Sequence, residues 1–198
     1  MDVSLFDLAL YNLNYVGHWY LNKGLTTTRL PRSSHASLTP CQTYRTGDGW
    51  IYLMCNKEKF WQALCHKIDR AVWIDDPRFL TFTERLVHRD LLTGLIDEAL
   101  TKHSTAEWMA LFQGVVPAAP ILDVQQALDN PWVRDSDRIE TLPLPGGDDF
   151  RYIAPPIRYK GRTRAGPAPA LGEHTDEVLQ RAGLSALEIA QLRELGVL

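Results

Sequence analysis

The sequence is poor in cysteine and shows no spacing of residues that is typical of a metal site. Its three cysteines, Cys41, Cys55 and Cys65, are an odd number, have no Cys-x-x-Cys spacing and are not accompanied by clustered histidines. This pattern argues against a disulfide framework and against a zinc site. We therefore expect three reduced thiols and no metal ligands.

Long hydrophobic runs are also absent. No apolar run approaches the roughly 20 residues that a helix needs to cross a bilayer. The first residues include Asp2 and Asp7, where a secretory signal would have basic side chains. We expect a cytoplasmic protein without membrane association.

The charges are balanced and are not gathered in blocks. The 198 residues include 21 Lys and Arg against 24 Asp and Glu, a formal net charge of −3, and no run of basic residues. Binding along a nucleic acid backbone is therefore not expected. With 45% hydrophobic and 23% charged residues, the composition is that of an ordinary globular protein with a real core.

Residues 37–65 show the clearest structural pattern. Alternation over residues 42–46 and 50–55 predicts two strands, and Gly47-Asp48-Gly49 predicts the turn between them. Asn56 is a candidate cap for a following helix. The apolar side of that helix would consist of Phe60, Trp61, Leu64 and Ile68.

The pattern predicts further helices before and after this hairpin. Residues 3–22 predict one helix with an apolar stripe, and Gly24 would end it. Its aromatic side chains spread over several faces, so we expect another part of the protein to cover this helix. Residues 26–39 are interpreted as a connector. Residues 83–102 predict a longer helix, and Ser104 with Glu107 forms a capping-box pattern for the next one.

The last third of the sequence is broken by proline and glycine. The segment 116–121 predicts a return linker or an edge strand. Asp123 is a candidate helix cap, and residues 139–153 predict two strands around Gly146-Gly147. Thr175 is a candidate cap for one more helix. The Ser185 and Glu188 pattern begins the last helix, which should stop at Gly196.

Several short motifs occur in an order that resembles a known family. They are Ser37 to Cys65, Asp76-Pro77-Arg78-Phe79, the following Arg85, Glu107-Trp108, Val116 to Ile121, and Leu171-Gly172-Glu173-His174-Thr175. Together they resemble the class III CoA-transferases, which include formyl-CoA transferase, carnitine CoA-transferase and the bile-acid-inducible F type. Residues 1–7 resemble a segment well inside the usual polypeptide, so the resemblance is to the C-terminal half.

The resemblance implies an α/β fold. It implies a small α+β domain over residues 39–115, flanked by segments of a doubly wound large domain. Residues 1–38 would supply a large-domain helix and connector, and residues 116–198 a return linker and the C-terminal large-domain segment. Members of this family form interlocked dimers, so we expect as partner either a second copy or a separate N-terminal half.

The resemblance also implies an activity. In the family, an aspartate attacks an acyl-CoA thioester, and CoA then passes to a carboxylic acid acceptor. No cofactor is needed beyond the CoA thioester, which is a substrate. The nucleophile precedes the segment that matches residues 1–7, so we predict no catalytic residue here and expect the isolated chain to be inactive. Asp2 and Asp7 are better explained as acids at the start of a helix.

We predict three substrate-binding residues, Asn56, Lys57 and His35. The Cys55 to Glu58 loop joins a strand to a helix, where free backbone N–H groups attract anions. Related acyl-CoA racemases have a catalytic glutamate at the position that matches Lys57, and Glu58 is one residue away. The structural alternative is that Asn56 caps the helix and that Lys57 is merely solvated.

His35 lies where the family often has a His-Pro pair, although Ala36 replaces the proline. A neutral histidine there could donate a hydrogen bond to the thioester oxygen. The alternative is an exposed connector residue.

Two other functions stay open. One is a non-catalytic assembly or CoA-binding module, which the missing aspartate favours. The other is an acyl-CoA racemase or isomerase of the same superfamily, against which Lys57 argues.

Overall fold

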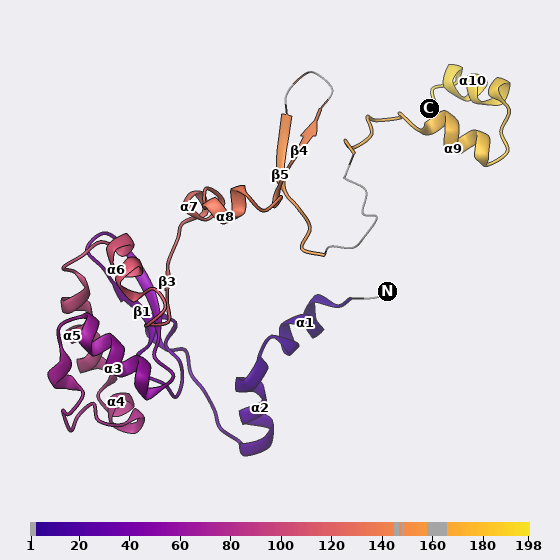
Figure 1. The fold of residues 1–198 in the computed structure, drawn as a ribbon. Helices are drawn as coiled ribbons and strands as arrows, with labels where there is room; N and C mark the ends of the chain where they lie inside the picture. The colour runs from indigo at the N-terminus through magenta and orange to yellow at the C-terminus, as the bar shows by residue number, and fades with distance from the viewer. Residues whose placement is uncertain (1–2, 145–146, 148, 158–165) are drawn as a thin grey trace. The chain divides into compact units, whose positions relative to one another are not determined.

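The computed structural model describes residues 3–144, 147, 149–157 and 166–198. The chain divides into two compact units, Met1–Leu122 and Asp123–Leu198 (Figure 1). Both contain helices and a small antiparallel sheet, so the chain is a mixed α and β protein. The three-part division predicted from the family resemblance stays a prediction.

The first unit contains a three-stranded sheet in the order β1-β2-β3, with antiparallel neighbours. Its strands are β1 (Cys41–Arg45), β2 (Trp50–Met54) and β3 (Ala118–Pro120). The predicted hairpin is confirmed, with Thr43 opposite Tyr52. β3 pairs only with β2 and ends in proline, so the alternative of an edge strand at residues 116–121 is also confirmed.

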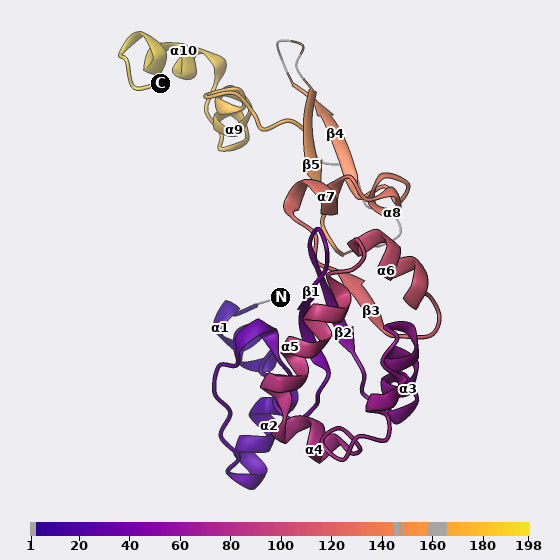
Figure 2. The ribbon, with the colours of Figure 1, turned by 90° about the vertical axis from the view of Figure 1, so that its left-hand side faces the viewer.

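Helices cover this sheet because its alternating side chains are apolar on one face. Tyr44, Ile51 and Leu53 are fully buried. α5 packs on β1 and α6 packs on β3, and α3 also contacts α6 (Figure 2). The helices of this unit after the first strand pair are α3 (Glu58–Lys67), the 3₁₀ turn η2 (Ala71–Trp73), α4 (Phe82–Val87), α5 (Arg89–Leu100) and α6 (Thr105–Phe112).

Aromatic side chains dominate the core of this unit. The rings of Trp61 and Trp73 each meet Phe79 edge to face, with centroids 6.3 Å and 6.1 Å apart. Trp108 stacks on Phe112 at 5.2 Å and donates its Nε1–H to the Leu100 carbonyl. All three tryptophans are buried in the core of this unit.

Arg85 is a fully buried cation in this core. Its Nη1 donates to the Phe79 carbonyl at 2.7 Å, its Nε donates to the Thr39 carbonyl at 3.2 Å, and its Nη2 pairs with Glu58 at 2.7 Å. The guanidinium also lies over the ring of Trp61, 5.1 Å from the centroid. One side chain therefore fixes the start of β1, the first turn of α3 and the segment before α4.

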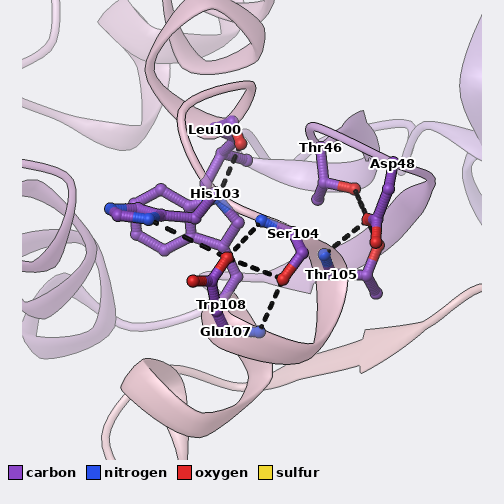
Figure 3. A network of polar contacts seen from close by, with 8 residues as sticks. All are labelled: Thr46, Asp48, Leu100, His103, Ser104, Thr105, Glu107 and Trp108. Carbon is purple, nitrogen blue, oxygen red and sulfur yellow. Dashed lines mark hydrogen bonds and ion pairs between the residues drawn. The ribbon is translucent and has the colours of Figure 1, made fainter.

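The tip of the hairpin is bonded to the start of α6 (Figure 3). Asp48 Oδ1 accepts from the Thr105 backbone N–H at 2.7 Å and from its hydroxyl at 2.9 Å, and these bonds lower the pKa of the Asp48 carboxyl. The Gly47 N–H donates to the His103 carbonyl at 2.8 Å, and a Cβ on Gly47 would come within 2.9 Å of that oxygen. The predicted capping box of Ser104 and Glu107 is confirmed.

Two predicted helices are each divided in the structure. Residues 3–22 form α1 (Leu5–Tyr11) and α2 (Asn14–Lys23), with Asn14 in a left-handed conformation at φ 51°. Residues 83–102 form α4 and α5, and the division is at His88, whose φ and ψ leave the helical range. The predicted stop at Gly24 is confirmed. No residue of α1 or α2 is buried, and Leu5 is 82% exposed.

The second unit contains a hairpin and short helices. Its elements are α7 (Val124–Leu128), α8 (Pro131–Arg134), β4 (Ile139–Pro143), β5 (Asp149–Ile153), α9 (Thr175–Arg181) and α10 (Ala186–Glu194). The Asp123 cap and the Ser185 and Glu188 capping box are confirmed. The strand pair is confirmed too, although Gly146 of its expected loop lies outside the described residues. Within the described ranges, no helix has the length and apolarity to cross a membrane.

The predicted cap at Thr175 is wrong. The structure has His174 at the cap position of α9 without a side-chain bond, and Thr175 is already the first helical residue.

The connector between α2 and β1 is attached to the first unit only in its second half. Residues 25–30 are in no helix or strand, and Arg29 is exposed. The 3₁₀ turn η1 (Pro31–Ser33) follows, where Arg32 pairs with Asp97 at 2.6 Å and its carbonyl accepts from the Thr43 hydroxyl. Ser34 donates to the Gln42 side chain at 2.7 Å.

Replacing Arg85 with Ala should destabilise the protein by about 3 kcal/mol, because it leaves two buried carbonyls and Glu58 without their donor. Urea unfolding followed by tryptophan fluorescence would measure this. The control is Arg78→Ala, which removes an exposed pair with Asp76 and should change the midpoint far less. Equal effects of the two substitutions would contradict the role given to Arg85.

Brief trypsin digestion should cut after Arg29 before it cuts after Arg32, since only Arg32 is bonded to the sheet and to α5. Mass spectrometry of the first fragments measures the order. The urea-unfolded chain, in which both sites are open, is the control. Earliest cleavage after Arg32, or within α5, would show that the second half of the connector is not packed.

Candidate functional site

The loop that follows β2 is held at two points. The Met54 N–H donates to the Pro117 carbonyl at 3.0 Å, and the Cys55 N–H donates to the Pro40 carbonyl at 2.9 Å. The prediction that Asn56 caps α3 is wrong. The cap position is occupied by Lys57, with extended backbone at φ −142° and ψ 148° and without a side-chain cap bond.

Asn56 and Lys57 are both exposed at this helix start. Among the described residues, neither side chain accepts or donates a hydrogen bond. The first N–H groups of α3 therefore have no side-chain acceptor, as a site for an anionic group requires. The arrangement removes the structural alternative for Asn56 and leaves both residues able to meet a ligand.

Glu58 has a different environment from Lys57. Its carboxylate pairs with the buried Arg85 guanidinium at 2.7 Å, and it is the first helical residue of α3. This bond gives the Glu58 carboxylate a structural role, since it is the charged partner of a buried cation. The acid one residue from the racemase-matching position thus serves the fold.

His35 lies in the connector and is half-buried. Its ring stacks on Tyr15 with centroids 5.5 Å apart and meets Trp19 edge to face at 6.4 Å. The Ser37 N–H donates to His35 Nδ1 at 3.1 Å. In the neutral ring the proton is therefore on Nε2, which can donate to a ligand. The alternative of a simply exposed connector histidine does not describe this packing.

Arg89 fixes the backbone of this histidine. Its Nη2 donates to the His35 carbonyl at 2.6 Å, and its Nε donates to the Thr39 hydroxyl at 3.1 Å. Burial and then the charge of Arg89 lower the pKa of His35. The imidazole is therefore neutral at pH 7 and is a hydrogen-bond donor without a charge. Sequence reasoning missed Arg89, because nothing in its spacing distinguishes it from a surface arginine.

The structure brings the connector and the loop to the same stretch of chain. The His35 N–H donates to the Cys41 carbonyl, and the Cys55 N–H donates to the carbonyl of the preceding Pro40. Across the described residues, no hydrogen bond joins the side chains of His35, Asn56 and Lys57. The connector and the loop are thus each bonded to the backbone of Pro40 or Cys41. No polar contact joins the two predicted parts of the site to each other among the described residues.

The cysteines do not provide a nucleophile at this site. All three are free and buried, as the sequence predicted for reduced thiols. Burial raises the pKa of the Cys55 thiol and raises that of Cys65 to about 12, so both are protonated at neutral pH. Nowhere in the described ranges do three His, Cys, Asp or Glu side chains come together as a metal site would require.

The acids near the C-terminus also have structural partners. Glu173 Oε2 accepts from the Ala170 N–H at 2.6 Å, and Asp176 pairs with Arg193 at 2.7 Å. Neither acid is bonded to His174, so these residues form no acid–base pair among the described contacts.

The fold and the motifs agree with one class of protein. Residues 1–175 match the family model described as CoA-transferase family III, so the chain belongs to this family. It is 29% identical to the acyl-CoA transferase of Fusarium pseudograminearum (strain CS3096), over 100% of this chain and 44% of that protein. It is 27% identical to the succinyl-CoA:mesaconate CoA-transferase of Haloarcula marismortui, over 93% of this chain and 46% of that protein.

The chain is also similar to solved structures. The orthorhombic crystal structure of Rv3272 from M. tuberculosis is 26% identical, with a TM-score of 0.70, over 87% of this chain and 45% of that one. A CAIB/BAIF family protein from Brucella suis, 24% identical, shares the fold with a TM-score of 0.73. The chain spans about half the length of the curated relatives it matches.

Replacing Arg89 with Gln should raise the pKa of His35 towards its usual value, because one of the two causes of its lowering is removed. An NMR titration of the His35 ring protons, assigned with a His35→Gln variant, would measure this. Arg134→Gln, which alters an exposed pair with Asp129 in the second unit, is the matched control. A titration of His35 that is the same in both variants would contradict the contact with Arg89.

Proposed function

We propose that this chain is the C-terminal part of a CoA-transferase that moves CoA from an acyl-CoA thioester to a carboxylic acid. The observation that supports this most directly is the family match over residues 1–175. Relatives named succinyl-CoA:glutarate and formyl-CoA:oxalate CoA-transferase, from Homo sapiens and Escherichia coli, also support a thioester donor and a carboxylate acceptor.

In this proposal, residues 1–198 position the substrate and do not supply the nucleophile. Covalent transfer requires a carboxylate placed beside the thioester. Glu58, the acid next to the predicted substrate loop, is engaged by Arg85. His35 would donate to the thioester oxygen, and the loop of Asn56 and Lys57 would receive an anionic group of the substrate.

The partner in the proposal is the part of the family fold that these residues do not include. Leu5, Tyr11 and Leu21 are 79–83% exposed, and such apolar helix faces are normally covered. We propose that a doubly wound large domain covers them, from a second copy in an interlocked dimer or from a separate N-terminal half. A cytoplasmic location is also part of the proposal, and CoA is a substrate rather than a bound cofactor.

A racemase or isomerase is less well supported. Its catalytic carboxylate would have to stand at Lys57 or Glu58, and the first is a cation while the second is paired. A non-catalytic CoA-binding module makes a prediction of its own, which is binding of acyl-CoA without transfer under any condition.

The purified chain alone should transfer no CoA between acids, and addition of a family N-terminal half should restore transfer. Hydroxylamine trapping with mass spectrometry should find no activated acid within residues 1–198.

In the restored assembly, Lys57→Ala should weaken acyl-CoA binding about tenfold, since it removes a charge-assisted contact. Lys67→Ala, at the other end of α3, is the control.

Turnover by the chain alone, with an activated Asp or Glu mapped in this sequence, would overturn the proposed absence of the nucleophile. Binding without transfer even in the assembly would favour the non-catalytic module.

A further inference from the structure

An open groove of about 740 Å³ lies on the first unit, between α3, α6 and the segment that leads to β3. Its walls are apolar, and Gln113 is the one polar side chain among the described residues that line it. The main wall residues are Phe60, Met109, Phe112, Val115, Val116 and Pro117. A groove of this size and polarity is typical of a site for a small, largely apolar ligand.

The groove begins where the predicted substrate loop ends. The Phe60 N–H donates to the Lys57 carbonyl at 3.0 Å, which fixes one wall to the loop. Pro117, another lining residue, accepts through its carbonyl from the N–H of Met54, the last residue of β2, at 3.0 Å. Two residues that line the groove are thus bonded to Lys57 and Met54, close to the predicted substrate loop.

Lys57 and Lys59 stand on either side of Glu58 at the start of α3, the helix that contributes Phe60 to the groove. Lys59 Nζ lies 5.1 Å from the centroid of the Phe60 ring, which forms part of the wall. Lys57 is at the start of the same helix, and no acidic side chain of the described residues lines the groove. An apolar groove with lysines near one of its lining residues complements an anionic molecule with a hydrocarbon tail.

We propose that this groove binds the hydrocarbon chain of an acyl-CoA that enters it past the Asn56 and Lys57 loop. The inference rests on the proposed function and specifies its substrate as an acyl-CoA with an extended aliphatic chain. A fully buried methylene improves affinity about fourfold. Because the groove is open, only part of each methylene is covered, and octanoyl-CoA should bind about 30-fold more tightly than acetyl-CoA.

The test is a calorimetric titration of the full 198-residue chain with acetyl-, butyryl- and octanoyl-CoA. Val115→Asp places a charge in the groove at a position that is 43% exposed, so the fold should tolerate it. This substitution should abolish the preference for octanoyl-CoA and leave acetyl-CoA binding unchanged. The control is Val87→Asp, at a position on α4 that is 71% exposed and outside the groove.

Lys59→Ala tests the lysines at the start of α3. It should weaken the binding of every acyl-CoA by a similar factor of about five. Lys67→Ala, at the far end of α3, should have no effect. Photo-crosslinking with an acyl-CoA that has a diazirine near the end of its chain should label residues 109–118.

The possible results separate this inference from the proposed function. Binding that does not depend on chain length, or crosslinks outside residues 109–118, would overturn the groove as the acyl site and leave the CoA-transferase proposal intact. Absence of binding by every acyl-CoA, both to the chain and to its assembly with a family N-terminal half, would contradict both. A change of oligomeric state in Val115→Asp, measured by light scattering, would show that the groove is instead an interface between copies.

Discussion

The first unit depends on one buried charge that cannot be neutralised. A guanidinium keeps its proton at any pH a protein meets, so the fold must surround Arg85 with acceptors instead. It does so with two carbonyls and one carboxylate from three separate segments. Arg89, four residues later, donates to the hydroxyl of Thr39, whose carbonyl accepts from Arg85. Thr39 is thus held by two arginines, of which Arg89 also bonds the His35 carbonyl and Arg85 also pairs with Glu58.

This constraint explains why the candidate site lies at one end of the sheet. Glu58 cannot turn towards a ligand without leaving Arg85 unpaired, so the first turn of α3 has a fixed orientation. The adjacent Asn56 and Lys57 have no such bonds and point to solvent. Lys57 therefore stays a predicted binding residue, whereas its neighbour Glu58 has a structural role.

Local patterns of the sequence predicted most of the elements, because hairpins, capping boxes and edge prolines are decided by nearby residues. The hairpin at Gly47 to Gly49, the Ser104 box and the edge strand before Ile121 are examples. The predicted caps at Asn56 and Thr175 were wrong, because starting a helix one residue earlier or later changes its free energy little. Arg85 bonds a residue 46 positions away, and Arg89 bonds one 54 positions away. Helical or strand periodicity in the sequence cannot predict such distant pairs.

The tie between the hairpin tip and α6 has a chemical consequence over long times. In an Asp-Gly pair the unhindered glycine nitrogen can attack the aspartyl carboxyl group with loss of water, and water then opens the resulting cyclic imide to isoaspartate. Here the Gly49 N–H is bonded to Thr46 Oγ1 at 3.0 Å, while the Asp48 carboxylate is bonded to Thr105. The attacking and attacked groups are held in other bonds, so the folded chain resists this form of protein ageing at its most susceptible dipeptide.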